Sequence, residues 1–186
     1  MNGFHVGSLV VATVVITVAV IFNKLINKRQ LTKNGWSDID VQLKRRADLI
    51  PSLVDVVKGY VTHERTLFEE ITQKRSAAMA AGNDPAARGA AESAFSRPVS
   101  KLVAVAEEYP DLKASGQFLS LQRQLADTED KIEMARRFYN GAVRELNILI
   151  ESVPFNLVAS AFGFKKCDYF EVGADSRVAP VISVEQ

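Results

Sequence analysis

The feature that most constrains this fold is a set of apolar residues at spacings of three and four between Trp36 and Arg75. Such spacing places apolar side chains along one stripe of an α-helix. We therefore predict one long amphipathic helix over this stretch, or two helices joined at Pro51. The positions of the stripe are Ile39, Leu43, Ile50, Leu53, Val54, Val57, Val61, Phe68 and Ile71.

Size and charge bound the class of the protein. The chain has 186 residues, which is room for one domain plus an anchor. It has 23 basic and 22 acidic residues, so its net charge is too small to attract nucleic acid or an acidic substrate. The single cysteine, Cys167, has no disulfide or CxxC partner. We expect it to act as a small, partly buried apolar residue.

The N-terminal segment predicts a membrane anchor. Val6 to Phe22 is a run of 17 residues without a charge. Extended to Ile26, with Lys24 reaching back toward water, a helix here matches a hydrocarbon core about 30 Å thick. A cleaved signal peptide is the alternative, but the chain has no basic n-region and no clear small-x-small cleavage site. We predict residues 1–26 as a transmembrane anchor.

Basic residues follow this run, and no acidic residue occurs before Asp38. By the positive-inside bias, the N-terminus lies outside and the long domain lies in the cytoplasm. Anionic lipid head groups explain this cluster better than nucleic acid, at about 1 kcal/mol per basic residue. The predicted membrane-interface residues are Lys24, Lys28, Arg29, Lys33 and Trp36.

A second helix is expected to open at Asp84, as N-cap, with Pro85 at its first position, and to end near Tyr109. Pro98 lies inside this pattern and is expected to bend the helix or to move its start to near Ser96. A flexible alanine-rich loop is the alternative for residues 77–90.

A third helix is predicted from Phe118 to Pro154, where apolar residues repeat at a spacing close to 3.5 over about five heptads. A short final helix is expected to end at Gly163. The remaining residues, 171–186, are predicted to form an extended tail.

Together these patterns predict an all-α fold, with an N-terminal transmembrane helix followed by an elongated up-and-down three- to four-helix bundle over residues 27–170. A straight first helix over residues 30–80 is about 75 Å long, whereas the second helix is about 36 Å long. The second helix therefore cannot cover the stripe near Ile39 and Leu43. Either the chain folds at Pro51, or this stripe packs on another copy in a homo-oligomer.

Arg46 falls close to the apolar stripe, between Leu43 and Ile50. Our hypothesis is that it pairs inside a helix contact with an acid of the third helix or of another chain, with Glu129 and Asp130 as candidates. A plain solvated arginine is the alternative. The predicted helix-contact and assembly residues are Ile39, Leu43, Arg46, Glu129 and Asp130.

Residues suited to catalysis are sparse. His63-Glu64 opens like the helix motif of zinc proteases, but Leu67 stands where the second histidine belongs. We predict no catalytic residue, no metal and no cofactor. A hydrolase with an unrecognised site that depends on Glu64 or Glu70 is kept as an alternative.

Three segments, WSDIDVQLKRRADLIPSLVDVVKGY, AVAEEYPDLKAS and FLSLQRQLADTEDKIEMARRFYNGAV, resemble the LemA family of bacterial membrane proteins over roughly residues 20–170. The resemblance implies a single N-terminal transmembrane helix and a helical bundle, with no established enzymatic activity and no recognised cofactor. The family includes relatives associated with magnetosome membranes, and many members are encoded near membrane metalloproteases. Pro98 and the tail after Phe170 depart from the family pattern.

The leading functional hypothesis is a non-enzymatic, single-pass scaffold or adaptor of the bacterial cytoplasmic (inner) membrane. It is expected to act through protein-protein contacts and to self-associate. Its expected partners are membrane lipid, a second copy, and a membrane protein such as a metalloprotease, but not nucleic acid. The resemblance alone implies one alternative, an accessory factor of a membrane metalloprotease or an envelope-stress system.

Overall fold

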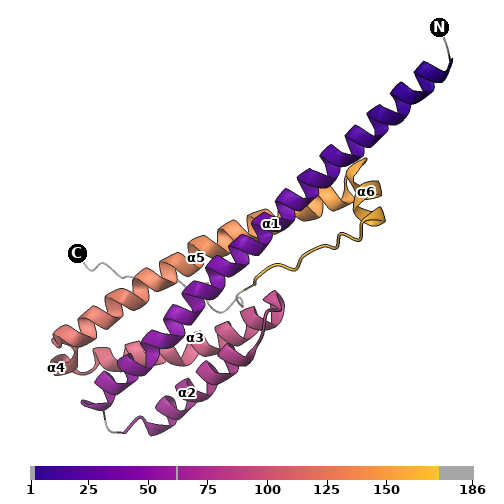
Figure 1. Ribbon diagram of the computed structural model, residues 1–186. Helices are drawn as coiled ribbons and strands as arrows, with labels where there is room; N and C mark the ends of the chain where they lie inside the picture. Colours follow the sequence, from indigo (N-terminus) through magenta and orange to yellow (C-terminus); the bar gives the residue numbers. More distant parts are fainter. Residues whose placement is uncertain (1–2, 62, 172–186) are drawn as a thin grey trace, which may run out of the picture. The chain divides into compact units, whose positions relative to one another are not determined.

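The computed structural model describes residues 3–61 and 63–171, and over these ranges its only regular secondary structure is helical (Figure 1). This confirms the prediction of an all-α fold. The helices are α1 (Gly3–Lys58), α2 (Arg65–Ala80), α3 (Pro85–Glu107), α4 (Pro110–Lys113), α5 (Gly116–Glu151) and α6 (Phe155–Ala161).

Helix α1 is continuous through Pro51 and ends at Lys58, and α2 begins at Arg65. Both alternatives for Trp36 to Arg75, a single helix and two helices joined at Pro51, are therefore wrong. Proline has no N–H to bond the carbonyl four residues earlier. Here the carbonyl oxygen of Ala47 instead accepts a hydrogen bond from Nε of Arg75 on α2, at 2.5 Å. The helix ends at Lys58, and the next residue, Gly59, has a low helix propensity.

The start of α3 agrees with the prediction. The Asp84 side chain accepts a hydrogen bond from the backbone N–H of Ala87 at 3.1 Å, and Pro85 is the first residue of the helix. The alternative of a flexible loop over residues 77–90 is therefore wrong. Pro98 lies inside α3 and does not move its start to Ser96.

The other predicted helices are also present. The third corresponds to α5, and the short final helix corresponds to α6, which is followed by Gly163 at a φ of +69°. At this φ the backbone is in the left-handed region, where glycine is favoured. The predicted tail over residues 171–186 falls almost wholly outside the described residues, which end at Glu171.

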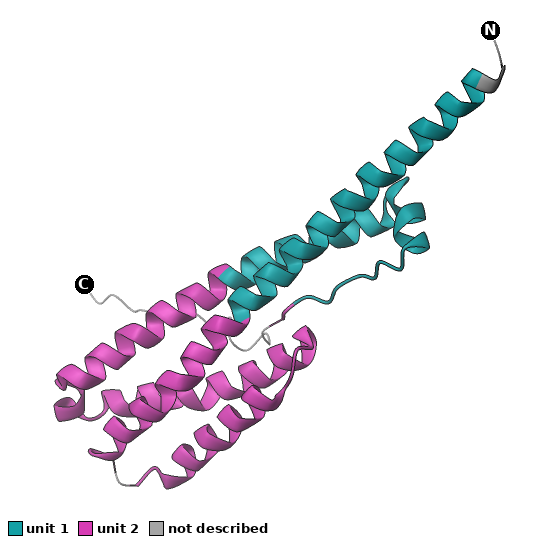
Figure 2. Ribbon diagram, in the orientation of Figure 1, with its two compact units in different colours: residues 1–39, 135–169 teal, residues 40–134, 170–186 magenta. Residues whose placement is uncertain are grey.

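The chain forms two compact units, and Figure 2 colours them separately. Unit 1 consists of residues 1–39 and 135–169, and unit 2 consists of residues 40–134 and 170–186. Helices α1 and α5 each contribute residues to both units. The predicted boundary at residue 26 lies inside α1 and stays a prediction about the membrane.

Each unit has its own apolar core. In unit 1, residues of α1 such as Ile21 and Leu25 cluster with Leu146 of α5 and Val158 of α6. Trp36 lies against Tyr139, with ring centroids 5.6 Å apart. The core of unit 2 is built from α1 to α5, and its buried members include Ile50, Leu53, Val57, Ile71, Phe95, Leu102, Leu112 and Phe118.

The expectation that a straight first helix leaves part of its stripe without an intrachain partner is wrong. Ile39 and Leu43 are 0% and 1% exposed within the single chain. Ile39 belongs to unit 1 and Leu43 belongs to unit 2. Helix α5, which has 36 residues, contributes to both units. Burial of these two residues therefore needs neither a fold at Pro51 nor a second copy.

Candidate functional site

The most unusual polar feature of unit 2 is a pair of opposite charges placed on two apolar stripes. Arg46 lies on the stripe of α1, three residues after Leu43, and Glu92 lies on α3, three residues before Phe95. Such spacing directs each charged side chain toward the core. Both are buried, at 4% exposure each.

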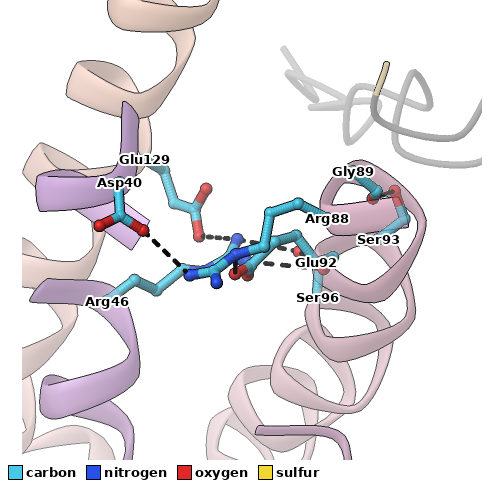
Figure 3. A network of polar contacts seen from close by, with 8 residues as sticks. All are labelled: Asp40, Arg46, Arg88, Gly89, Glu92, Ser93, Ser96 and Glu129. Atoms are coloured by element: carbon cyan, nitrogen blue, oxygen red, sulfur yellow. Dashed lines mark hydrogen bonds and ion pairs between the residues drawn. The ribbon is translucent and has the colours of Figure 1, made fainter. Parts of the chain in front are cut away.

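Three helices meet in the network around these residues, which Figure 3 shows. Nη2 of Arg46 forms an ion pair with one carboxylate oxygen of Glu92, and Nε of Arg88 donates to the other at 3.0 Å. Nη1 of Arg46 donates to the hydroxyl of Ser96 at 2.9 Å and to Glu129 at 3.0 Å. One carboxylate therefore links two guanidinium groups.

The rim of the network is open to solvent. Arg88 forms an ion pair with Asp40 of α1 at 3.5 Å, and the Asp40 side chain is 53% exposed. Glu129 is 46% exposed.

At the buried centre, the guanidinium of Arg46 lies 5.3 Å from the ring centroid of Phe95, which is cation-π geometry. Two arginines thus face one buried and two half-exposed carboxylates.

This arrangement ties α1, α3 and α5 together at fixed positions. A buried ion pair adds little net stability, but removal of one partner leaves a buried charge without compensation, at a cost of about 3 to 5 kcal/mol. The network can therefore specify how the three helices register. Its members lie on different helices and are held by mutual ion pairs.

Sequence reasoning found only part of this network. It singled out Arg46 and named Glu129, which is its partner at 3.0 Å, and Asp130, which is exposed. The alternative of a solvated Arg46 is wrong. It missed Glu92 and Arg88, although the position of Glu92 on the stripe of Phe95 and Val99 was a readable signal. The assembly role predicted for this set stays a prediction.

Four of the five predicted membrane-interface residues have partners inside unit 1. Nζ of Lys24 lies 5.1 Å from the ring centroid of Phe155, and the guanidinium of Arg29 lies 5.0 Å from that of Phe164. Lys28 pairs with Glu145 at 2.5 Å, and Lys33 is exposed. Trp36 is half-buried against Tyr139, the helix-packing contact described above.

Two surface carboxylates have lowered pKa values. The hydrogen bond from Lys28 holds the pKa of Glu145 below its ordinary value, and the charge of Lys28 adds to this effect. The hydrogen bond from Lys131 lowers the pKa of Asp127 in the same way. The Lys28 pair joins α1 to α5, the Lys131 pair lies within α5, and each carboxylate favours its pair as the anion.

An open groove runs along α2 in unit 2, and its volume is about 710 Å³. Six of its eight lining residues are polar or charged, among them Arg65 and Gln73, and the two apolar ones are Val61 and Phe68. Lys58 lies over the Phe68 ring, 5.5 Å from the centroid. A groove along a helix can accept a peptide or a helix of a partner.

Comparison with known proteins places the chain in a family. The profile described as "LemA family" matches residues 35–184. The chain belongs to the LemA family. It is similar to "Magnetosome protein MamQ 2" of Paramagnetospirillum magneticum, with 24% identity over 188 residues, which cover 88% of this chain and 69% of the relative. It is also similar to "Protein LemA" of Metamycoplasma hominis, with 28% identity over 156 residues, which cover 84% and 71%.

In this member of the LemA family, the described residues contain no group of three or more histidine, cysteine, aspartate or glutamate side chains that could hold a metal ion. His63 and Glu64 precede α2, and Leu67 is buried on it. The names of the family and of these relatives state no enzymatic activity. The residues described above form ion pairs and packing contacts, without a nucleophile beside a base.

Proposed function

We propose that this protein is a single-pass membrane adaptor that acts through protein-protein contacts and not through catalysis. The observation that supports this most is the exposed N-terminal part of α1. The side chains of residues 5–17 are all exposed, and only 11% of the most apolar 18-residue window is buried. Apolar surface left in water costs about 25 cal/mol per Å², a cost that a bilayer removes.

The same helix carries both the apolar segment and part of the core of unit 2. Helix α1 runs from Gly3 to Lys58 without interruption, and its buried residues include Ile50 and Val57. The continuous helix supports a role in which a bundle is held at the membrane to present a surface. The groove along α2 is the surface that we propose for this role.

The anchor is tested by removal of residues 1–16. Among the described residues, the core contacts of unit 1 begin after this segment, at Val18. The full chain is expected to stay in the membrane pellet after alkaline carbonate washing, and the shortened chain is expected to be released. A soluble full chain would contradict the anchor. Circular dichroism checks that the shortened chain keeps its helices.

We place the N-terminus outside the bacterial inner membrane and the bundle in the cytoplasm, because Lys24, Lys28, Arg29 and Lys33 follow the apolar segment. The test uses Lys101→Cys, at an exposed position of α3, in a chain that also carries Cys167→Ala. A membrane-impermeant maleimide is expected to label it only after the cells are permeabilised. Labelling in intact cells would contradict this orientation and would place the bundle outside the membrane.

The docking role of the groove is tested by Gln73→Trp, which fills it, beside Ala77→Trp, an exposed position of α2 outside its lining. Crosslinking in membranes is expected to give a protein adduct with the natural chain and with Ala77→Trp, but not with Gln73→Trp. Mass spectrometry of the adduct identifies the partner, including a membrane metalloprotease. Equal amounts of adduct from all three chains would exclude the groove as the docking surface.

Self-association stays part of the proposal, although Ile39 and Leu43 no longer support it because both are buried within one chain. Light scattering on the detergent-extracted full chain measures its mass. If the mass is a multiple of the chain mass, exposed apolar residues such as Val41 and Met134 are the positions to substitute next.

A further inference from the structure

Helix α6 packs against α1 at the end of the uncharged segment. Figure 1 shows α6 beside α1. The ring of Phe22, the last residue before the polar residues Asn23 and Lys24, lies 4.8 Å from that of Phe162 and 5.8 Å from that of Phe164, between centroids. The cluster of this contact begins at Val18 on α1 and includes Val158 and Ala159 of α6.

The uncharged run is too short to cross a bilayer without the residues that take part in this packing. Val6 to Phe22 is 17 residues, so as a helix it rises about 26 Å, whereas the hydrocarbon core is about 30 Å thick. A crossing by this run therefore needs its last residues, from Val18 to Phe22. Any tilt of the helix adds to this requirement. The residues that complete the crossing are therefore those on which α6 packs.

The exposed surface of this corner is suited to a bilayer. Between Ser152 and Phe164 no residue is charged. Val153, Leu157 and Phe162 are 78%, 69% and 56% exposed, which is unusual for large apolar side chains on one short corner.

Basic residues border the same corner. Lys165 and Lys166 follow it directly in the sequence and are exposed, and Lys166 forms an ion pair with Glu151, which directly precedes the corner. Lys24 and Arg29 of α1 lie over the rings of Phe155 and Phe164. An apolar surface edged by lysine and arginine is typical of segments that lie in the interface of an anionic membrane.

We propose that the corner formed by residues 152–164 is a second membrane contact, which enters the interface of the same bilayer leaflet from which α1 emerges. This inference rests on the proposed anchor. Its occupant is lipid, with acyl chains against Leu157 and Phe162 and anionic head groups against the basic border. The continuity of the corner with the membrane-crossing residues of α1 favours lipid over a second copy of the chain.

The test measures the surroundings of nitroxide labels on the full chain in vesicles of phosphatidylethanolamine and phosphatidylglycerol. Labels are placed at Leu157→Cys, at Val10→Cys in the anchor, and at Met79→Cys on α2, each with Cys167→Ala. All three label positions are exposed in the single chain, so the labels lie outside both cores, and Cys167→Ala is common to the three chains. Collisions with oxygen report lipid, and collisions with a water-soluble nickel complex report water.

The Leu157 label is expected to lose nickel collisions relative to the Met79 label and to gain oxygen collisions, as the Val10 label does. If the Leu157 label behaves like the Met79 label while the Val10 label lies in lipid, the second contact is overturned and the anchor stands. If the Val10 label also contacts water, both are overturned. Low collision rates with both reagents at Leu157 would indicate a protein contact, such as a second copy, and would overturn the lipid assignment.

Discussion

At the scale of single residues, the charge of Glu92 is the most consequential in the described structure, because it balances two buried arginines. We predict that Glu92→Gln lowers the free energy of unfolding by about 3 to 5 kcal/mol, since Arg46 and Arg88 lose their shared anion. The matched change Glu129→Gln, at a half-exposed partner of Arg46, is expected to lower it by about 1 kcal/mol or less. Denaturant titration followed by circular dichroism compares the two, and equal losses would contradict the network.

A second prediction at this scale concerns pH. The pKa of Glu145 is lowered by its hydrogen bond with Lys28, so the folded state favours its anion. This stabilisation is present above the ordinary carboxyl value of about 4.3 and is lost as the pH falls through the lowered pKa. At pH 7 we therefore expect a lower Tm for Glu145→Gln than for the natural chain. This difference in Tm should vanish in stronger acid. With Lys28→Met already present, Glu145→Gln should change Tm little at either pH.

At the scale of helices, α1 shows how tertiary contact overrides a local signal. The carbonyl of Ala47, left without its helix partner by Pro51, is bonded by Arg75. We predict that Arg75→Met lowers the free energy of unfolding by about 1 to 3 kcal/mol in the natural chain. The loss should be smaller beside Pro51→Ala, whose N–H can bond Ala47. A double-mutant cycle measures this coupling, and additivity within about 0.5 kcal/mol would exclude it.

Helix α1 also marks the limit of prediction from sequence. Apolar spacing predicted the long helices α1, α3 and α5, because burial of one face is a property of the local pattern, but it did not predict α4 or the separation of α2 from α1. The local pattern left open whether α1 breaks at Pro51, since the donor that compensates for this proline, Arg75, is 24 positions farther along the chain. The actual break, after Lys58, was not predicted. Glu92 could have been found by the same spacing that identified Arg46, but its ion pairs depend on how α1 and α3 pack.

At the scale of the whole molecule, the C-terminal segment takes part in both units without any helical pattern to predict it. In unit 1 the side chain of Asn147 exchanges hydrogen bonds with the backbone of Cys167 at 2.9 and 3.0 Å, and the hydroxyl of Tyr139 donates to the carbonyl of Asp168 at 2.8 Å. In unit 2, Phe170 is fully buried. Such contacts depend on the completed fold, so apolar spacing could not reveal them.

The last prediction concerns Gly89 on α3, where a methyl group would overlap the carbonyl oxygen of Glu171. Because that oxygen belongs to backbone, we expect Gly89→Ala to displace the segment that carries Phe170 and to lower the free energy of unfolding by about 1 to 3 kcal/mol. Trypsin should then cut faster after Lys165 and Lys166. The control is Gly141→Ala on α5, where an added Cβ meets no atom within 4 Å. Its higher helix propensity should stabilise the protein by up to about 1 kcal/mol and leave the cleavage rate unchanged, so faster cleavage in both variants would contradict a role specific to Gly89.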